Sequence, residues 1–181
     1  MMGSRDETRR LRGRAAFAVA LGSNLGDRLA FLAFGVERIR VFSEGLRVSS
    51  VYETEPRYVE TQGDFLNAAC TGLTRLTPRQ LLGQLQDAER AAGRVREGTR
   101  FGPRVLDMDL LLFGDRVIEE SDLVVPHPRL AERGFVLCPL AEIAGEWLVP
   151  DRAGGPPYSV ESLAAAVGSE GVRRRDDLEI S

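Results

Sequence analysis

The sequence contains no lysine, because all 24 of its basic residues are arginine. This absence excludes a Walker-type phosphate-binding lysine, a Schiff-base lysine and a catalytic Ser-Lys pair. Any phosphate group must therefore be held by arginine, by backbone N–H groups or by a metal ion. The planar guanidinium group of arginine suits that task because it can bind two oxygens at once.

Cysteine and histidine are also scarce, with two cysteines and one histidine in 181 residues. Cys70 and Cys138 lie far apart in apolar stretches, so we expect buried free thiols and a reducing, cytoplasmic location. These three residues do not make a convincing zinc site. The net charge of -3 gives no overall basic surface, so we expect no nucleic acid as a partner.

No apolar run approaches the roughly 20 residues of a membrane span, so we expect no membrane partner. Residues 1–14 are polar and rich in arginine, and with the apolar run after them they imitate a short signal peptide. Asp6 and Glu7 argue against that interpretation, because a signal peptide begins with a positively charged region. We expect a disordered leader over residues 1–14, one domain over residues 15–168 and a flexible tail over residues 169–181.

The most informative stretch is 102–113, in which an apolar run follows Gly-Pro and precedes Gly-Asp. This pattern predicts a β-strand. Asp107 and Asp109 interrupt it two residues apart, so both side chains point to one face, while Met108 and Leu110 point to the other. Two carboxylates on one face suit Mg²⁺, which prefers oxygen ligands. An edge strand with one solvated face is the alternative.

The part before this strand predicts a strand over residues 16–21, a Gly-Ser-Asn loop and a helix that Asp27 can cap. The loop either binds an anion through its backbone N–H groups or is a plain strand-to-helix turn. A second strand is expected over residues 47–52 and a third over residues 65–76, joined by a long polar loop.

Phe65 and Asn67 stand two residues apart at the start of the third strand, so a ring and an amide share one face. They either stack on a flat heterocycle and bind its edge, or form an ordinary core phenylalanine beside an asparagine of a turn. A capped helix is expected over residues 78–92, with Gln86 and Glu89 on one side. A solvated helix face is the alternative for this pair.

An arginine-rich loop over residues 93–104 leads directly into the two aspartates. Its arginines either pair with the aspartates or, with Mg²⁺ present, form a clamp for a polyphosphate. We expect His127 within reach of the same site, with a structural hydrogen bond as the alternative. Helices are expected over residues 133–143 and 160–167.

The expected order is strand, helix, strand, strand, helix, strand. This is an α+β fold with a ferredoxin-like β-α-β-β-α-β core, in which an antiparallel sheet carries its helices on one face. The later helices are additions to that core. We find no internal repeat and no second domain.

Several blocks between residues 18 and 143 together resemble the 6-hydroxymethyl-7,8-dihydropterin pyrophosphokinase family. They are L-G-S-N-L-G-D-R, Y-E-T-E-P, F-L-N-A-A, G-R-V-R, F-G-P-R-V-L-D-M-D-L-L-L-F-G, V-P-H-P-R and R-G-F-V-L-x-P-L. The resemblance implies an enzyme of folate biosynthesis that transfers the β,γ-diphosphate of ATP to the hydroxymethyl oxygen of the pterin and releases AMP. It implies a monomer whose partners are these two substrates, with possible association with other folate-pathway enzymes.

The same resemblance implies roles for individual residues. Two Mg²⁺ ions would be held by Asp107 and Asp109. The residues implied to bind the pterin are Thr54, Phe65, Asn67, Phe101 and Phe135. The residues implied to bind ATP are Gln86, Glu89, Arg94, Arg104, Leu110, His127 and Arg133. Arg94 and Arg104 would also act as catalytic phosphate clamps.

Two other functions stay open at this point. A nucleotidyl transferase or cyclase also places carboxylates on a ferredoxin-like sheet, but it would release pyrophosphate instead of AMP. A non-catalytic RNA-binding module of the same topology would carry aromatic residues on its central strands and a net positive charge. The central strand here carries aspartates and the net charge is negative, so the pyrophosphokinase is the favoured hypothesis.

Overall fold

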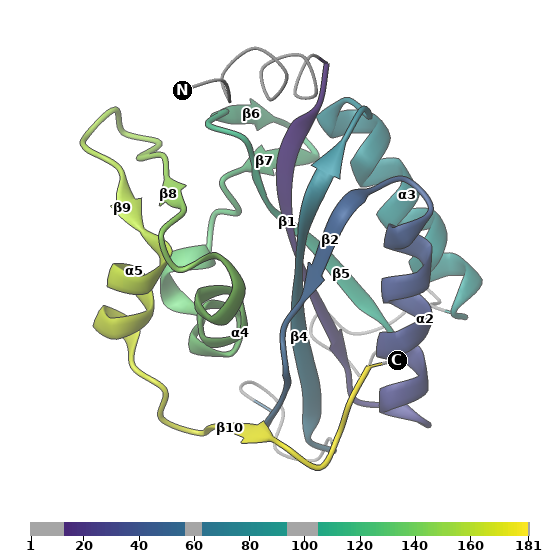
Figure 1. The fold of residues 1–181 in the computed structure, drawn as a ribbon. Helices are drawn as coiled ribbons and strands as arrows, with labels where there is room; N and C mark the ends of the chain where they lie inside the picture. The colour runs from purple at the N-terminus through teal and green to yellow at the C-terminus, as the bar shows by residue number, and fades with distance from the viewer. Residues whose placement is uncertain (1–12, 57–62, 94–104, 181) are drawn as a thin grey trace, which may run out of the picture.

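The computed structural model describes residues 13–56, 63–93 and 105–180 of the chain (Figure 1). The first elements are β1 (Ala15–Ser23), α2 (Arg28–Arg40), β2 (Glu44–Val48), β3 (Val51–Thr54), β4 (Phe65–Thr74), α3 (Pro78–Ala91) and β5 (Asp107–Phe113). After them come β6 (Ile118–Glu120), β7 (Leu123–Val125), the 3-10 helix η1 (Leu130–Glu132), α4 (Gly134–Ala144), β8 (Leu148–Val149), β9 (Tyr158–Ser159), α5 (Val160–Val167) and β10 (Val172–Arg175).

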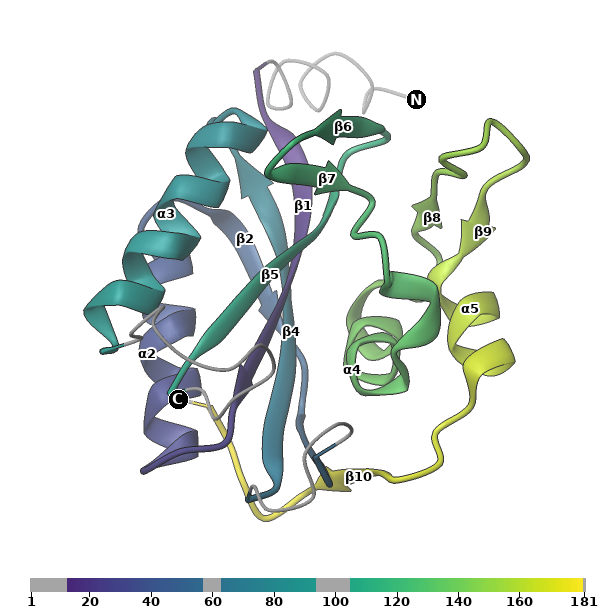
Figure 2. The same ribbon diagram turned by 180° about the vertical axis from the view of Figure 1, so that it is seen from behind.

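A six-stranded sheet forms the middle of the molecule, with the strand order β10-β3-β4-β1-β5 and β2 also paired with β4. Every pair in it is antiparallel, as the sequence predicts. Helices α2 and α3 cover one face, and α4 covers the other, with α5 outside α4 (Figures 1 and 2). The two helices of the expected core, α2 and α3, thus share one face, and the later helices α4 and α5 lie on the other.

The sheet is covered on both sides because its strands carry apolar side chains on both faces. The cluster between the sheet and α2 and α3 includes Phe17, Val19, Leu32, Leu85 and Met108. The cluster between the sheet and α4 includes Ala18, Ala69, Leu112, Val136 and Leu140. Burying a large aliphatic side chain contributes roughly 1.5–3 kcal/mol, so neither face can be left in water.

The first two helices begin where local signals predict. The Asp27 carboxylate accepts a hydrogen bond of 3.1 Å from the backbone N–H of Ala30 at the start of α2. Thr77 and Gln80 form a reciprocal capping box at the start of α3, and Pro78 occupies its first turn. These side chains satisfy backbone N–H groups that no helical carbonyl can reach.

The strand expected over residues 47–52 is instead two strands, β2 and β3, separated by Ser49 and Ser50. Ser49 donates its backbone N–H to the carbonyl oxygen of Ala69 at 2.9 Å. Its hydroxyl oxygen accepts from the N–H of Ala69, also at 2.9 Å. A side-chain oxygen thus replaces the backbone carbonyl in the ladder with β4, and the strand is interrupted there.

The tail also differs from the flexible segment that the sequence predicts. Residues Val172–Arg175 form β10, which pairs with the outer edge of β3. Beyond it, Leu178 and Ile180 pack against the core on the α2 side of the sheet. Edge pairing and apolar contacts hold this segment in place, and a run of three arginines gave no sign of either.

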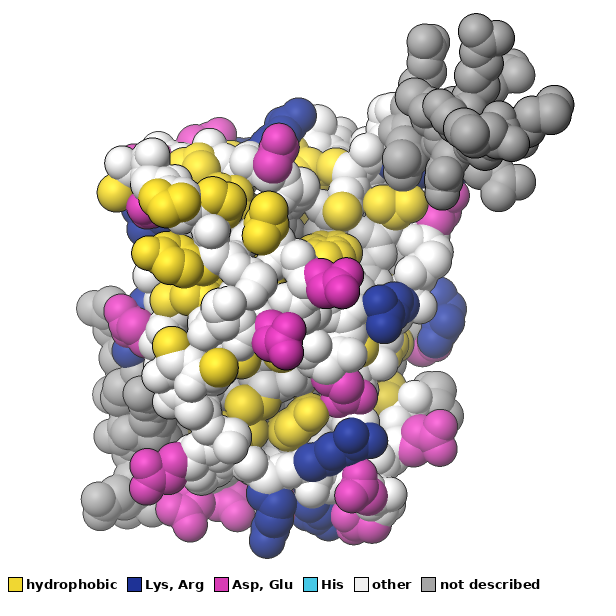
Figure 3. All heavy atoms as spheres, turned by 60° about the vertical axis from the view of Figure 1, so that its left-hand side comes forward, with side chains coloured by type: hydrophobic (Ala, Val, Ile, Leu, Met, Phe, Trp, Pro, Cys, Tyr) yellow, Lys and Arg dark blue, Asp and Glu magenta, His cyan; other side chains and the backbone are white. Residues whose placement is uncertain are grey.

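One face of the molecule carries many hydrophobic side chains. Figure 3 shows them mainly on the upper left of the view, among scattered charged side chains, while arginines and carboxylates crowd its lower edge. The exposed hydrophobic residues include Leu148 and Tyr158, in the β8–β9 hairpin. Within the described ranges, no helix has the length and apolar character needed to cross a membrane.

Glu53 of β3 is a buried carboxylate, 7% exposed, on which three arginines converge. Its oxygens lie 3.0 Å from Nη1 of Arg28, 2.7 Å from Nη2 of Arg173 and 2.5 Å from Nη1 of Arg175. Burial alone would raise the pKa of Glu53, but the hydrogen bonds from Arg173, Arg175 and Arg28 outweigh it and lower the pKa.

We expect Glu53→Gln to lower the free energy of unfolding at pH 7 by about 1 kcal/mol, since water partly screens the three arginines. Because folding lowers the pKa of Glu53 below its ordinary 4.5, its stabilisation is present above that pH and is lost as the pH falls through the lowered pKa. Urea unfolding from pH 7 to pH 3 should show the two proteins converging in acid. Glu44→Gln, at an exposed ion pair with Arg14, is the control and should have a smaller effect at pH 7. A constant difference at all pH values would contradict the assignment.

A second buried carboxylate joins α3 to β5. Glu89, 4% exposed, accepts a hydrogen bond of 2.8 Å from the backbone N–H of Met108. We expect Glu89→Ala to cost about 1–3 kcal/mol of stability, because it leaves a buried N–H without its acceptor, whereas Glu89→Gln keeps an oxygen there and should cost less. Urea unfolding measures both, with Asp87→Ala on the exposed side of α3 as the control. Equal losses for the two Glu89 variants would show that this hydrogen bond does not matter.

Candidate active site

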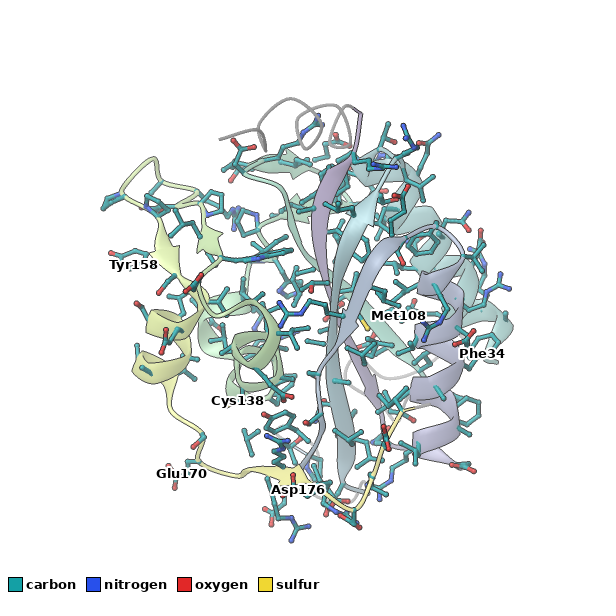
Figure 4. The ribbon with its side chains drawn as sticks, in the orientation of Figure 1. Phe34, Met108, Cys138, Tyr158, Glu170 and Asp176 are labelled. Carbon is teal, nitrogen blue, oxygen red and sulfur yellow. The ribbon has the colours of Figure 1, made fainter. Side chains whose placement is uncertain are left out.

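The two aspartates of β5 lie on the face of the sheet that α4 covers. Asp107 pairs with Gly22 of β1 and Asp109 pairs with Ala20, while Met108 and Leu110 are buried in the core on the opposite side. Figure 4 labels Met108 on the side of α2, away from α4. The prediction that the two aspartates share one face is confirmed.

Asp109 lies among groups that act on its charge in opposite directions. Burial raises the pKa of Asp109, and the neighbouring Asp107 raises it further, whereas His127 and Arg133 lower it; the net shift is upward. Nη1 of Arg133 lies 3.1 Å from Oδ2 of Asp109, and Nε2 of His127 lies 3.8 Å from the same oxygen. An additional cation near the two carboxylates would favour their charged forms.

His127 is held by the backbone on both sides. Its backbone N–H donates to the carbonyl oxygen of Leu111 at 2.9 Å, and its ring Nδ1 accepts from the backbone N–H of Arg129 at 3.2 Å. The neutral ring therefore carries its proton on Nε2, the nitrogen that faces Asp109. Burial lowers the pKa of His127, although Asp109 opposes that shift. The expected position near the site and the alternative structural hydrogen bond are both found.

Arg133 stands between η1 and α4 with a side chain that is 15% exposed. Its guanidinium carbon lies 5.7 Å from the centre of the Phe135 ring, close enough for a cation–π contact. Its Nε is buried and has no hydrogen-bond partner among the described residues. A buried donor without an acceptor is costly, so this nitrogen is suited to an anionic or polar ligand.

Thr54, Phe65 and Asn67 meet where β3 joins β4. Thr54 pairs with Phe65 across the two strands, and Nδ2 of Asn67 donates to Oγ1 of Thr54 at 3.0 Å. This hydrogen bond orients the amide and leaves Oδ1 as its acceptor end. Gly22 pairs with Asn67 on one side and with Asp107 on the other, so these three residues lie in one row across the sheet, with the backbones of β4 and β5 about 10 Å apart.

The glycine in the middle of this row keeps the space beside the amide open. A Cβ atom added at Gly22 would lie 3.4 Å from Oδ1 of Asn67. Tyr52 pairs with Asn67 from β3 and donates its hydroxyl to Glu142 of α4 at 3.0 Å. Burial and the Glu142 carboxylate raise the pKa of Tyr52 to about 12, so this hydroxyl stays protonated.

Three residues implied to bind ATP lie away from the aspartate face. Leu110 has its side chain in the core on the α2 and α3 side, because strand alternation separates it from Asp109. The Glu89 carboxylate is occupied by the backbone of β5. Gln86 is half-buried one turn earlier on α3. The side chain of Leu110 therefore does not face the aspartates, and the implied part of Leu110 in ATP binding stays a prediction.

Three further predicted site residues, Arg94, Phe101 and Arg104, lie outside the described residues. Among the described ranges, no group of three or more His, Cys, Asp or Glu side chains has an arrangement that could hold a metal.

Arg28 and Glu53 lie in the blocks that resemble the family, but sequence reasoning assigned these two residues no role. The Y-E-T-E-P block was the signal that could have drawn attention to Glu53.

Known proteins are similar to this chain in sequence and in fold. The model of the family described as 7,8-dihydro-6-hydroxymethylpterin-pyrophosphokinase (HPPK) matches residues 18–145. The 2-amino-4-hydroxy-6-hydroxymethyldihydropteridine pyrophosphokinase of Bacillus subtilis (strain 168) is 43% identical over 157 residues, which cover 86% of this chain and 87% of that protein. The folic acid synthesis protein fol1 of Pneumocystis carinii is 40% identical over 75% of this chain, but the match covers 18% of that protein.

A solved structure of Plasmodium falciparum HPPK-DHPS with SDX-DHP has a similar fold, with a TM-score of 0.67 over 89% of this chain and 48% of that chain. At 13% identity this likeness shows the fold alone. The family model and the Bacillus subtilis relative each cover most of the present chain. They confirm the resemblance drawn from the motifs, and the chain belongs to the 7,8-dihydro-6-hydroxymethylpterin-pyrophosphokinase family.

Proposed function

We propose that this chain transfers the β,γ-diphosphate of ATP to the hydroxymethyl oxygen of 6-hydroxymethyl-7,8-dihydropterin, which gives the pterin diphosphate and AMP. Its family is one of transferases of folate synthesis. The observation that carries the reaction is the pair Asp107 and Asp109 on one face, with Arg133 and His127 beside it. Substitution at phosphorus mainly requires alignment of the reactants and neutralisation of charge, which these groups can provide.

The pterin is proposed to lie beside Thr54, Phe65, Asn67 and Phe135. Oδ1 of Asn67 is fixed as a hydrogen-bond acceptor by the bond from Nδ2 to Thr54, so it can accept from N–H groups at the edge of the heterocycle. Phe65 on β4 and Phe135 on α4 supply rings from two different elements. A flat ring between them would bury its faces against aromatic carbon.

The donor set at Asp107 and Asp109 fits Mg²⁺, which binds through one or two carboxylates and completes its shell with water and phosphate oxygens. We propose that the pair holds two such ions. Bound there, the ions would supply neutralisation of phosphate charge and a lowered pKa of the attacking alcohol. Arg133 then orients the phosphates through its guanidinium group, and His127 donates from Nε2 toward the same region.

ATP is proposed to lie along the outer edge of β5. That edge is flanked by Glu89, which bonds Met108, and by His127, which bonds Leu111. Leu110 lies between these two contacts, so its backbone rather than its side chain is the part available to a ligand. Gln86, which lies on α3 with Glu89, is also proposed to bind ATP.

The strand order supports the ferredoxin-like interpretation of the core. If β2 and β3 count as one interrupted strand, the sheet order is β3, β4, β1, β5 with α2 and α3 on one face. We propose the β-α-β-β-α-β core on this basis, with α4, α5 and β10 as additions.

We further propose a cytoplasmic monomer that can associate with other folate enzymes. The similar Plasmodium falciparum structure is that of an HPPK-DHPS protein, and two Arabidopsis thaliana relatives are named as bifunctional folate synthesis proteins. Such names describe those proteins. They support association as a hypothesis for this chain.

The first test is nucleotide analysis after incubation with ATP, Mg²⁺ and 6-hydroxymethyl-7,8-dihydropterin. We expect AMP to appear one-for-one with the pterin diphosphate. ADP would indicate transfer of the γ-phosphoryl group and pyrophosphate would indicate nucleotidyl transfer; either product would overturn the proposal. Omission of Mg²⁺ should abolish turnover, because the two carboxylates alone only add negative charge.

We expect Asp107→Ala and Asp109→Ala each to lower kcat by about three orders of magnitude or more, because each removes a proposed metal ligand. The fold should persist, since both side chains are only half-buried. Steady-state kinetics measure the effect, and Asp115→Asn in the exposed turn after β5 is the control. Near-normal turnover in either aspartate variant would remove the metal assignment.

A further inference from the structure

The C-terminal strand β10 lies outside residues 18–145, which match the family model. It pairs with β3 so that Val172 stands opposite Thr54 and Arg173 opposite Glu53. Thr54 is one of the residues proposed to bind the pterin. The strand therefore lies beyond the part that the family model matches, and it contacts one wall of the proposed pterin site.

The arginines of β10 bind that wall through Glu53. Arg173 and Arg175 both reach Oε2 of Glu53, and Arg28 from the start of α2 reaches Oε1. Arg175 also binds Asp177 with its remaining nitrogens, at 2.8 and 2.7 Å, which fixes the direction of its guanidinium group. Glu53 is thus held between the tail and the first helix.

The same cluster holds both ends of the connection between β3 and β4. Nη1 of Arg28 also donates to the carbonyl oxygen of Asp64 at 2.8 Å. Glu53 directly precedes Thr54, and Asp64 directly precedes Phe65. A change in the position of Arg28 and Glu53 would therefore move both Thr54 and Phe65.

The tail contacts the opposite wall as well. A Cβ atom added at Gly134, the first residue of α4, would lie 2.8 Å from the carbonyl oxygen of Gly168 and 3.7 Å from Cγ2 of Val172. Gly134 directly precedes Phe135, the second proposed stacking ring. The segment from Gly168 to Val172 thus packs against the start of α4 while its next residues pair with β3.

The chain is held in place on both sides of β10. Before it, α5 ends at Val167, packed beside α4; after it, Leu178 and Ile180 pack against the core on the other face of the sheet. Figure 4 shows the tail running from Glu170 past Asp176 around the sheet edge, and Figure 1 shows it ending near α2. A strand fixed on both sides can act as a rigid spacer.

We propose that β10 sets the separation between the two walls of the pterin site, and that Arg173 and Arg175 are positioning residues that act through Glu53 on Thr54 and Phe65. This inference rests on the proposed function. Neither arginine needs to touch a substrate. Their effect should be larger on pterin affinity than on ATP affinity. Arg133 lies between η1 and α4 and His127 lies after β7, so the two residues that reach Asp109 do not belong to the cluster around Glu53.

The test compares Arg173→Ala/Arg175→Ala with the unmodified full chain. Isothermal titration measures the Kd of 6-hydroxymethyl-7,8-dihydropterin with Mg²⁺ and a saturating α,β-methylene analogue of ATP, and separately the Kd of that analogue. We expect pterin affinity to fall about tenfold, because small displacements of binding groups are costly, while the Kd of the analogue changes less than twofold. Arg173→Lys with Arg175 unchanged should keep most of the pterin affinity, because it keeps a positive charge beside Glu53.

Arg174→Ala is the matched control, since Arg174 lies on the same strand but pairs with Asp176 at 2.8 Å. If the double variant does not fold, the single variant Arg173→Ala, whose side chain is 71% exposed, replaces it with a smaller expected loss. Unchanged pterin affinity, or equal losses for both ligands, would overturn the positioning role while leaving the proposed function intact. Absence of pterin-dependent AMP formation in the unmodified chain would overturn both.

Discussion

The two-residue period of β5 is the constraint on which the site depends. Alternation places Asp107 and Asp109 on one face and Met108 on the other, where it is buried. Two carboxylates beside an apolar layer repel each other, so positive charge must lie near them. Arg133 supplies part of that charge at 3.1 Å from Asp109, and it can do so because α4 packs on the aspartate face. The position of α4 and the chemistry of β5 are therefore linked.

Features with local signals were predictable from the sequence. The apolar run with two aspartates, the caps of α2 and α3, and the bounds of α5 each depend on residues a few positions apart. The division between β2 and β3 was missed because Ser49 bonds to Ala69, which is distant in sequence. Strand alternation predicted that the side chain of Leu110 faces away from the aspartates, and it is buried in the core on that side.

The contacts of the tail with the candidate site were also missed, because they join residues that are far apart in the sequence. Three consecutive arginines followed by two aspartates look like a solvated charge run, and Arg174 with Asp176 is one. Arg173 and Arg175 differ only because β10 pairs with β3, which brings them to a carboxylate 120 residues or more earlier in the chain. Sequence reasoning proposed Thr54 and Asn67 as site residues, but it had no means of finding a support that comes from so far away in the chain.

The arginines of this lysine-free chain have two different structural uses. Arg175 binds Glu53 with one nitrogen and Asp177 with two others, which a single ammonium group could not reproduce in fixed directions. Structural arginines of this kind direct their nitrogens to protein carboxylates. Arg133 differs: of the buried side-chain nitrogens in the described ranges, its Nε alone lacks a hydrogen-bond partner. The same residue type thus serves two purposes, and an unpaired donor marks the arginine that is suited to a ligand.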